Sequence, residues 1–565
     1  MKRILVIQLH RFGDIIETTP LFPALKEKYH KSYLAVVAQR DYAEVLIGNP
    51  YVDEIFLFDK GGLIKEIQCK DIPLKASYDK IHAFIEELRK RKFDLVINIS
   101  SDDLSALIAY LLKVRDTKGV SYAEDGFRYH RQKWMIYFFS LLKHRIYNSF
   151  NMVDIHLGVG EIPFGRRSAE TSASSVEPLS RSQWQPFLPI DGESKAFSER
   201  FYKENGITDN DFVVGFQLGA SRAHKTWPSK YFARLGDELI KNEGAKLILF
   251  GHPLEVQLGK DVCSLMNNKP INAIGKTNIK QLGAMLQRCQ YLISNDTLTA
   301  HIAAAVGTKV IGIFLSTCFV HDTAPYGEGH LLLQPNLFCQ PCTEATLCKE
   351  LRCRDLISPE MVLSTMRIVD CSERNNSALE SVDVSLYRTQ FDCDGMLECV
   401  PIIKRHLTDG DILRYCYRNF WKGYLGVSRK ITEAKDFFNE IEKYYTIEAS
   451  LIDLRLSSGR SLKKHIQSFN ELSTLCGAGV KLINMGTESA SFSERIGDID
   501  RKIIEIEGCA SFLTNLYVIE KTNMAEDITA LTKRDILELY MRTQRNARLM
   551  KGMLMKIEKT VDSIE

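Results

Sequence analysis

Short apolar runs alternate with amphipathic segments along the first part of the chain. Apolar runs of this length suit buried strands, and charged segments with a helical period suit helices that cover a sheet. The alternation therefore predicts a mostly parallel sheet with helices on both faces. The predicted strands are Lys2–Leu9, Ser32–Gln39, Glu54–Phe58 and Phe93–Ile99, and the predicted helices are Ile15–Tyr29 and Tyr78–Arg91.

The same alternation returns in the middle of the chain, which predicts a second sheet of the same kind. The fold class is therefore α/β, with two doubly wound units. A ligand is expected in the cleft between them, at the carboxyl ends of the strands. The second set of predicted strands is Phe212–Leu218, Ala245–Gly251, Tyr291–Ile293 and Lys309–Leu315, with helices at Lys230–Asn242, Asn278–Arg288 and His301–Ala305.

Polar stretches set the expected domain boundaries. A segment rich in Ser, Glu, Pro and Arg separates the two units, and another polar segment follows the second unit. Beyond that point the pattern changes to charged amphipathic helices. The expected organisation is a first unit at 1–165, a linker at 166–190, a second unit at 191–370, a linker with short strands at 371–408, and a helical extension at 409–565.

Charge and hydropathy limit the classes of partner. The 565 residues include 74 basic and 71 acidic side chains, and the formal net charge is +3. This balance argues against nucleic acid as the main partner. No apolar run approaches the ~18 to 20 residues of a membrane span, and no cleavage site follows the short apolar run at the N-terminus. We therefore expect a cytoplasmic protein.

One segment, residues 126–149, contains the run WMIYFFSLL with basic side chains on both sides. Aromatic residues with basic neighbours can dock on an anionic membrane surface, which would place the protein peripherally at the inner membrane. The alternative interpretation is a core helix with a charged rim. The helical extension after residue 409 has no visible chemistry, and we expect it to pack or to self-associate into a homo-oligomer.

The first candidate for chemistry is the turn Ser294-Asn295-Asp296-Thr297, which joins a predicted strand to a predicted helix. A helix N-terminus just past the carboxyl end of a parallel strand offers free N–H groups and a positive dipole to a phosphate. Asp296 and His301 lie at the same mouth and could bond sugar hydroxyls or phosphate oxygens. The alternative is an ordinary strand-to-helix turn.

A second loop, Gln217–Pro228, also follows a predicted strand. Gly219 allows close approach of the backbone, and Arg222 and Lys225, near Ser221, supply the positive charge that suits a diphosphate. A solvated basic loop is the alternative. After the next strand, Glu255 could border a nucleoside, although an ordinary surface turn would also explain it.

Asp14 follows Gly13 after the first predicted strand, where a carboxylate could act as a general base. A helix N-cap is the alternative use of Asp at such a position. Four cysteines form the pattern C-x2-C-x5-C-x4-C. Four thiols so close together could hold a structural zinc or iron ion, and a thiol-rich loop is the alternative. These are Cys339, Cys342, Cys348 and Cys353.

These motifs occur in an order and spacing that resemble those of the bacterial ADP-heptose:lipopolysaccharide heptosyltransferase family (glycosyltransferase family nine). The resemblance covers about residues 1 to 370. It is carried by RILVIQLHRFGDIIETTPLFPALK, IGNPYVDEIFLFDK and DLVINIS in the first unit. In the second unit it is carried by LGASRAHKTWP, ISNDTLTAHIAAAVGTKVIGIF and CQPCTEATLCKELRCRDLISPEMV.

The resemblance implies a two-domain GT-B fold, with an N-terminal acceptor domain and a C-terminal nucleotide-sugar donor domain. It implies transfer of a heptose from a nucleotide sugar, ADP-heptose, to a hydroxyl of lipopolysaccharide core or another glycan. Inversion at the sugar and no need for a catalytic metal are also implied. By motif position Asp14 corresponds to the base and Lys225 to a residue near the donor phosphates. Asp296, Thr297 and His301 correspond to donor contacts.

Two positions depart from the family pattern. Relatives usually have Gly directly after the Asp-Thr pair, where this chain has Leu298, and many have smaller residues before the Gly-Asp pair than His10-Arg11-Phe12. Leu298 favours a rival interpretation, a non-catalytic scaffold that binds saccharides or nucleotide sugars and oligomerises through its C-terminal helices. The joint presence of Asp14, Lys225, Asp296 and His301 favours the enzyme.

Overall fold

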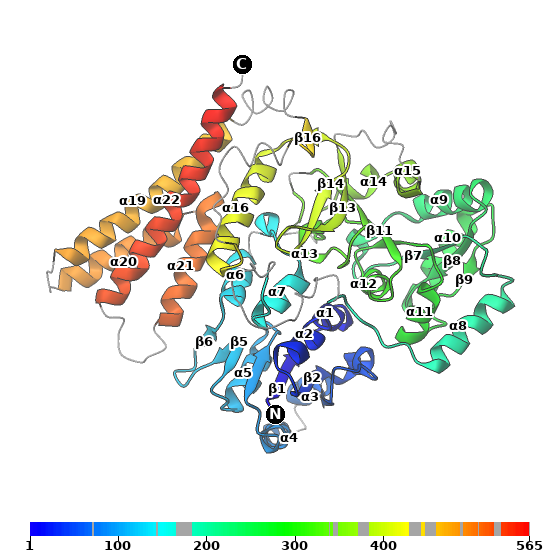
Figure 1. Ribbon diagram of the computed structural model, residues 1–565, viewed down its shortest axis with the longest axis horizontal. Helices are drawn as coiled ribbons and strands as arrows, with labels where there is room; N and C mark the ends of the chain where they lie inside the picture. Colours follow the sequence, from blue (N-terminus) through cyan, green and yellow to red (C-terminus); the bar gives the residue numbers. More distant parts are fainter. Residues whose placement is uncertain are drawn as a thin grey trace, which may run out of the picture. The chain divides into compact units, whose positions relative to one another are not determined.

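The computed structural model describes residues 1–69, 73–142, 145–164, 184–337, 339–342, 348–370, 383–428, 442–446, 459–485, 490–506, 508–524 and 533–563. The chain divides into two compact units (Figure 1). Unit 1 comprises Met1–Ser100, Leu111–Asp116 and Phe150–Arg405, and unit 2 comprises Ser101–Tyr110, Thr117–Ser149 and His406–Glu565.

The first sheet of unit 1 contains four parallel strands in the order β3-β2-β1-β4. Its central strand is fully buried from Ile4 to Ile7, as expected for a sheet covered on both faces. The strands are β1 (Arg3–Gln8), β2 (Tyr33–Gln39), β3 (Glu54–Phe58) and β4 (Leu95–Asn98). The associated helices are α1 (Phe12–Thr18), α2 (Leu21–Lys28), η1 (Arg40–Leu46), α3 (Lys60–Gln68), α4 (Leu74–Lys90) and α7 (Met152–Val159).

The second sheet of unit 1 has eight strands in the order β14-β13-β12-β11-β10-β7-β8-β9. The strands from β12 to β9 are parallel, and β13 and β14 are antiparallel additions at one edge. The strands are β7 (Val213–Gln217), β8 (Lys246–Phe250), β9 (Ile271–Asn272), β10 (Tyr291–Asn295), β11 (Lys309–Ile313), β12 (Leu331–Pro335), β13 (Val384–Phe391) and β14 (Leu397–Pro401).

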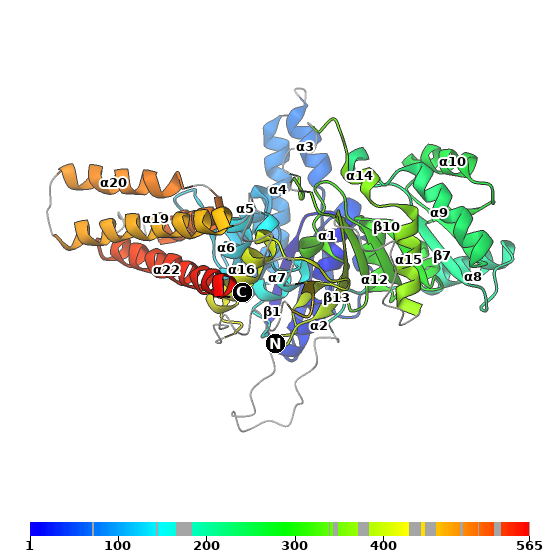
Figure 2. The same ribbon diagram turned by 90° about the horizontal axis from the view of Figure 1, so that it is seen from above.

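Helices cover this second sheet on both faces, and Figure 2 shows α8, α9 and α10 at its far end. The helices are α8 (Gly192–Glu204), η4 (Ala223–Lys225), α9 (Ser229–Asn242), η5 (Pro253–Glu255), α10 (Val256–Leu265), α11 (Ile279–Leu286), α12 (Leu298–Ala305), α13 (Val320–Thr323), α14 (Cys353–Leu356) and α15 (Pro359–Asp370).

The segment expected as a linker at 371–408 instead contributes to this sheet. Its described part begins at residue 383, and β13 pairs with β12 so that Leu386 lies opposite Leu333. Val384 and Leu386 belong to the buried core of the second sheet. The structure therefore places the short strands expected in this segment inside the domain, because their apolar face completes the edge at β12.

Unit 2 combines a hairpin from the first part of the chain with the C-terminal helices. The long helices α19 and α22 pack along each other, and Figure 2 shows α20 beside them. The remaining elements are α5 (Asp103–Leu111), β5 (Thr117–Tyr122), β6 (Arg128–His130), α6 (Lys133–Leu141), η2 (Arg145–Tyr147), β15 (Arg405–His406), α16 (Asp409–Leu425), β16 (Tyr445–Thr446), α19 (Gly459–Asn484), α20 (Ala490–Ile504), η9 (Gly508–Ala510), α21 (Ser511–Met524) and α22 (Lys533–Ser563).

Residues 117–149 were expected in the first unit, but they cluster with the helical extension instead. His130 exchanges two backbone hydrogen bonds with the side chain of Asn523, and the side chain of Asn515 donates to the carbonyl of Ser140. The expected boundary at 165 therefore does not coincide with the structural division. The reason is that α6 is too apolar to be a surface helix, and α21 covers it.

The same packing corrects the membrane interpretation of residues 126–149. Trp134, Tyr137 and Leu141 are buried, and the ring of Tyr137 lies 4.9 Å from that of Trp421 on α16. The aromatic run is therefore a core helix, the alternative interpretation from the sequence. Lys143 and His144 lie outside the described residues. In the part of the chain that the structure describes, no helix has the length and apolar character needed to cross a bilayer.

Candidate active site

Asp14 lies in the first turn of α1, just beyond the carboxyl end of β1. Its Oδ2 accepts the N–H of Arg11 at 3.1 Å, and its Oδ1 lies 3.9 Å from Nδ1 of His10. The side chain is 39% exposed. The N-cap of α1 is Arg11, so Asp14 is not the N-cap that one interpretation predicts, although its side chain accepts the N–H of that residue. The exposure of Asp14 leaves its carboxylate open to a ligand, and its role as a base stays a prediction.

The turn between β10 and α12 holds the second group of predicted residues. Thr297 is the N-cap of α12, and its Oγ1 lies 3.2 Å from Oγ of Ser294. Oδ2 of Asp296 accepts a hydrogen bond from Thr323 at 3.2 Å. Leu298 is the first residue of the helix and is partly buried. No side chain caps the first N–H groups of α12, and uncapped N–H groups at a helix N-terminus are donors that an anion can use.

Helices α1 and α12 bring the two groups together. A Cβ atom at Gly13 would lie 3.9 Å from Cδ2 of His301. Nδ1 of His301 lies 3.6 Å from Oε1 of Glu17, and both side chains are almost fully buried. The predicted base and two predicted donor contacts, Asp296 and His301, therefore belong to one site.

The charges of this site act on one another. Burial raises the pKa of Glu17 well above its usual value, and the carboxylates of Asp14, Asp296 and Asp322 raise it further. Burial lowers the pKa of His301, against the opposing effects of Asp296 and Asp14. The site therefore favours a neutral acid beside a neutral imidazole.

The basic loop after β7 borders the same region. Lys225 lies in η4, and both Lys225 and Asp296 act electrostatically on the thiol of Cys318. Burial raises the pKa of that thiol, Asp296 adds to the rise, and Lys225 opposes it. Lys225 and Asp296 therefore both lie within electrostatic reach of Cys318, whereas Ser221 and Arg222 are exposed on the loop.

Glu255 and Gly219 form one contact. Oε2 of Glu255 accepts the N–H of His252 at 2.8 Å and a hydrogen bond from Gln217 at 3.0 Å. A Cβ atom at Gly219 would lie 1.7 Å from Oε1 of Glu255. Glu255 therefore borders the predicted donor loop, and a side chain at Gly219 would displace its carboxyl group.

Two residues of the site were not found from the sequence. Asn295 donates to the carbonyls of Leu218 and Gly219 at 3.0 and 3.2 Å, and its Oδ1 accepts the N–H of Trp227 at 2.9 Å. This side chain ties the basic loop to the turn before α12. The other is Glu17. The feature of the sequence that could have pointed to Glu17 is its position as a lone acidic residue on the apolar face of a predicted helix.

The cysteine cluster is only partly described. Cys339 and Cys348 are exposed, Cys342 is half-buried and Cys353 is buried. Burial raises the pKa of the Cys342 thiol to about 11, and the neighbouring Cys339 and Cys353 add to the rise. Residues 343–347 lie outside the described residues. Among those described, no three His, Cys, Asp or Glu side chains are placed to hold a metal, so zinc or iron there stays a prediction.

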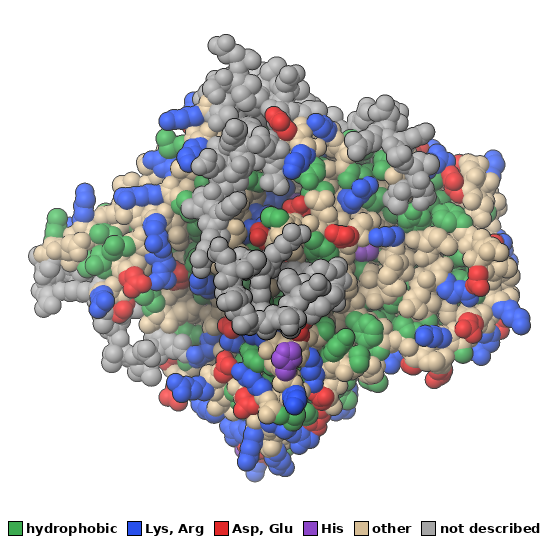
Figure 3. Space-filling model, viewed as in Figure 1, with side chains coloured by type: hydrophobic (Ala, Val, Ile, Leu, Met, Phe, Trp, Pro, Cys, Tyr) green, Lys and Arg blue, Asp and Glu red, His purple; other side chains and the backbone are tan. Residues whose placement is uncertain are grey.

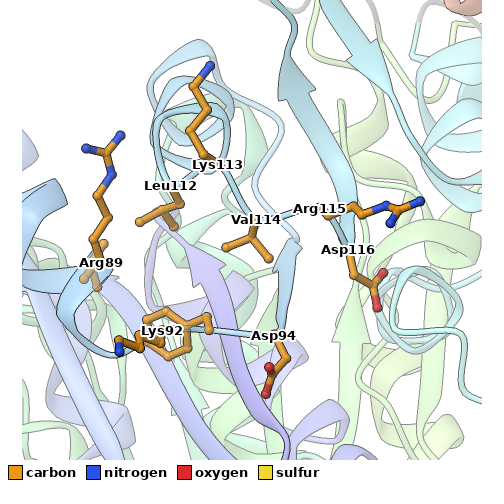
Figure 4. Close-up of a pocket in the computed structure, with 10 residues that line it drawn as sticks. Arg89, Lys92, Asp94, Leu112, Lys113, Val114, Arg115 and Asp116 are labelled. Carbon is orange, nitrogen blue, oxygen red and sulfur yellow. The ribbon is translucent and has the colours of Figure 1, made fainter.

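A separate cavity of about 700 Å³ lies at the amino end of β4. Because β1 and β4 are parallel, the cavity lies at the amino ends of the strands of the first sheet, whereas Asp14 lies beyond their carboxyl ends. Figure 3 shows Lys and Arg side chains gathered at the lower edge, where Figure 1 draws α4. The cavity is therefore not part of the candidate site. Figure 4 shows the basic side chains around it: Arg89, Lys92, Lys113 and Arg115.

Two mostly parallel sheets, with helices on both faces and polar turns at their carboxyl ends, form a fold of the GT-B type. Comparison with known structures agrees. The fold matches the crystal structure of the glycosyl transferase family 9 protein from Veillonella parvula DSM 2008 with a TM-score of 0.52 and 24% sequence identity. The match covers 65% of this chain and 97% of that one.

Residues 81–351 match the model of glycosyltransferase family 9 (heptosyltransferase). The chain is 25% identical over 313 residues to lipopolysaccharide heptosyltransferase 3 of Escherichia coli K12, covering 54% of this chain and 80% of that protein. It is 22% identical over 324 residues to lipopolysaccharide heptosyltransferase 2 of Salmonella typhimurium LT2, covering 55% and 82%. The helical C-terminal region lies outside the family match.

Proposed function

We propose that unit 1 transfers a heptose from ADP-heptose to a hydroxyl of lipopolysaccharide core or another glycan, with inversion at the anomeric carbon. The observation that carries this proposal is the meeting of α1 and α12, which sets Asp14 beside Asp296 and His301. The relatives named as lipopolysaccharide heptosyltransferases support the sugar, and the resemblance of the motifs supports the nucleotide.

In this proposal the donor diphosphate binds between the loop at Gly219–Lys225 and the N-terminus of α12. Lys225 and the N–H groups at Thr297 face the phosphates, and Asp296 and His301 contact sugar hydroxyls or phosphate oxygens. Glu255 holds the donor loop from behind. Positive charge and preorganised N–H groups stabilise the diphosphate as it leaves, which is the electrostatic effect expected to dominate.

Asp14 acts as the general base in this mechanism. The acceptor oxygen attacks the anomeric carbon of the heptose while its proton passes to Asp14, and the bond from that carbon to the diphosphate breaks. No step needs a metal ion. In this proposal, closure of the two domains over the donor excludes water from the reacting atoms and limits hydrolysis of the donor.

The base is tested with Asp14→Asn, which keeps the size of the side chain and removes its ability to take a proton. We expect turnover to fall by roughly 10² to 10⁴-fold while calorimetric binding of ADP-heptose stays near the unmodified level. Asp79→Asn is the matched control, because Asp79 is exposed on α4. Full turnover by the Asp14 variant would exclude this residue as the base.

The rival function is a scaffold that binds a nucleotide sugar or saccharide without transferring it. Leu298 favours it, because a side chain replaces the family's usual glycine at the start of α12. Calorimetry with ADP and ADP-heptose, with turnover followed on the same samples, separates the two. Sugar transfer supports the enzyme, whereas saturable binding without transfer or hydrolysis supports the scaffold. A cytoplasmic location and a homo-oligomer remain predictions.

A further inference from the structure

Glu17 is a buried acid that the mechanism above does not use. It lies on the inner face of α1, with its side chain 8% exposed. The groups that face it are His301 on α12, Asp296 in the turn before α12, and Asp322 on α13, together with Asp14 on its own helix. Three of these four neighbours are carboxylates, so a fourth negative charge here would be strongly disfavoured.

The backbone that carries Glu17 is held in place by α7 and β1. Nδ1 of His156 lies 3.2 Å from the carbonyl of Glu17 and 3.3 Å from Oγ1 of Thr18. Burial lowers the pKa of His156 to about 4, so this histidine is neutral. Gln8 on β1 donates to Thr18 at 2.9 Å, and Thr18 donates to the carbonyl of Asp14 at 2.7 Å. Glu17 is therefore presented to His301 from a fixed position.

The partner of Glu17 has two chemically different ring nitrogens. Nδ1 of His301 faces Oε1 of Glu17 at 3.6 Å, slightly longer than a hydrogen bond. A neutral imidazole has one N–H donor and one acceptor nitrogen, and a hydrogen bond at one nitrogen decides which tautomer is present. If a protonated carboxyl donates to Nδ1, the hydrogen of the ring must be on Nε2.

We propose that Glu17 is a positioning residue for the sugar donor: in its protonated form it donates to Nδ1 of His301 and so leaves the Nε2–H of that ring to donate to a phosphate or hydroxyl oxygen of the nucleotide sugar. Nδ1 of His301 and Oε1 of Glu17 lie 3.6 Å apart. In this proposal, the two atoms move to hydrogen-bond distance when the donor binds. This inference rests on the proposed function, because it assigns the donor site to the groups around His301.

The proposal has a consequence for pH. The raised pKa of Glu17 keeps the acid neutral at pH values where an ordinary glutamate is ionised. As pH rises through that raised pKa, Glu17 loses its proton, the hydrogen bond to Nδ1 is lost, and a negative charge appears beside Asp14 and Asp296. Donor affinity is therefore expected to be full at lower pH and to decline on the alkaline side.

Two variants separate the hydrogen bond from the charge. Glu17→Gln keeps a donor and is permanently neutral, so it should bind ADP-heptose within about twofold of the unmodified chain and lack the alkaline decline. Glu17→Leu keeps the volume and removes the donor. It should bind at least about tenfold more weakly, as expected for a lost hydrogen bond to a ligand-binding group, with a larger effect on KM than on kcat. Glu27→Gln on α2 is the control.

A measurement without substrate keeps the inference testable if transfer is never observed. Nitrogen-15 spectra of histidine side chains, with His301→Gln used for assignment, should show the Nε2–H tautomer in the unmodified chain and in Glu17→Gln, and a tautomer mixture in Glu17→Leu. Thermal unfolding verifies that each variant is folded. An Nδ1–H tautomer in the unmodified chain, or equal donor binding by Glu17→Leu, would overturn the proposal. Absence of transfer with the expected tautomers would instead count against the proposed function.

Discussion

Gly219 shows how a single residue can decide the shape of the donor loop. It follows β7, and its α-carbon faces the carboxyl group of Glu255, which is itself held by His252 and Gln217. Because Glu255 has two hydrogen bonds, it cannot move aside without losing them. A side chain at Gly219 would therefore cost the hydrogen bonds of Glu255, independent of any ligand.

We expect Gly219→Ala to destabilise unit 1 by about 1–3 kcal/mol, the usual cost of overpacking a filled site, and to weaken donor binding because the loop must shift. Chemical denaturation followed by calorimetry with ADP measures both effects. Gly192→Ala is the control, since nothing lies within 4 Å of a Cβ at that position. Equal loss in both variants would mean that the contact with Glu255 is unimportant.

At the scale of single residues, the sequence predicts Asp14, Lys225, Asp296 and His301 as site residues, because each lies in a turn or helix after a predicted strand and carries a reactive or charged group. These assignments stay predictions. The sequence predicts no functional role for Glu17 or Asn295, and the physical reason is the same for both. Their importance arises from groups far away in the sequence, such as His301 for Glu17 and Leu218 for Asn295. Local patterns contain no information about such partners.

The N-termini of the helices that follow strands determine where anions can bind. Helix α12 begins at Leu298, directly after the N-cap Thr297, and no side chain caps its first N–H groups. These donors can bind an anion in the donor half of unit 1. The side chain of Leu298 is attached at the same turn, so it decides how closely a phosphate can approach.

If Leu298 narrows this site, Leu298→Gly should bind ADP more tightly, by roughly three- to tenfold, at a stability cost of about 0.5–1 kcal/mol for glycine in a helix. Calorimetry and thermal unfolding measure the two changes. Leu298→Ala separates side-chain size from backbone freedom, because it removes the bulk without adding a glycine. Unchanged or weaker ADP binding by both variants would exclude a steric role for Leu298.

At the scale of elements, strands and helices with strong hydrophobic periods were predictable, and their caps helped to place their ends. Val384–Phe391 and Leu397–Pro401 were expected only as short strands in a linker. Their true role depends on the free edge of β12, with which β13 pairs. Tertiary packing decides which strand pairs with a free sheet edge. The local sequence pattern therefore does not predict this pairing.

The whole molecule is divided in a way that does not follow the order of the chain. Unit 2 takes Thr117–Ser149 from the first half and His406–Glu565 from the end. The contact is specific, because Asn523 bonds the backbone of His130 and Asn515 bonds that of Ser140. The helical extension is therefore a structural partner of the earlier segment, and not an independent appendix.

Truncation of the chain at residue 375 is expected to give an aggregating or strongly destabilised product. The cut removes β13 and β14 from the second sheet and removes α16 and α21 from around Trp134 and Tyr137. Light scattering after size exclusion and binding of a hydrophobic dye measure the exposed apolar surface. A cut at residue 563, outside every contact described above, is the control. A stable, monomeric product from the cut at 375 would contradict this view of the extension.

The interleaved unit also has a consequence for how the protein is made. Asn515 is 375 residues after the Ser140 carbonyl to which it donates, so α6 leaves the ribosome roughly 20 to 75 seconds before α21 at ordinary rates of synthesis. Throughout that interval the aromatic face of α6 has no native cover. Unit 2 therefore cannot form before α21 has been synthesised, and the apolar face of α6 is prone to aggregation during that time.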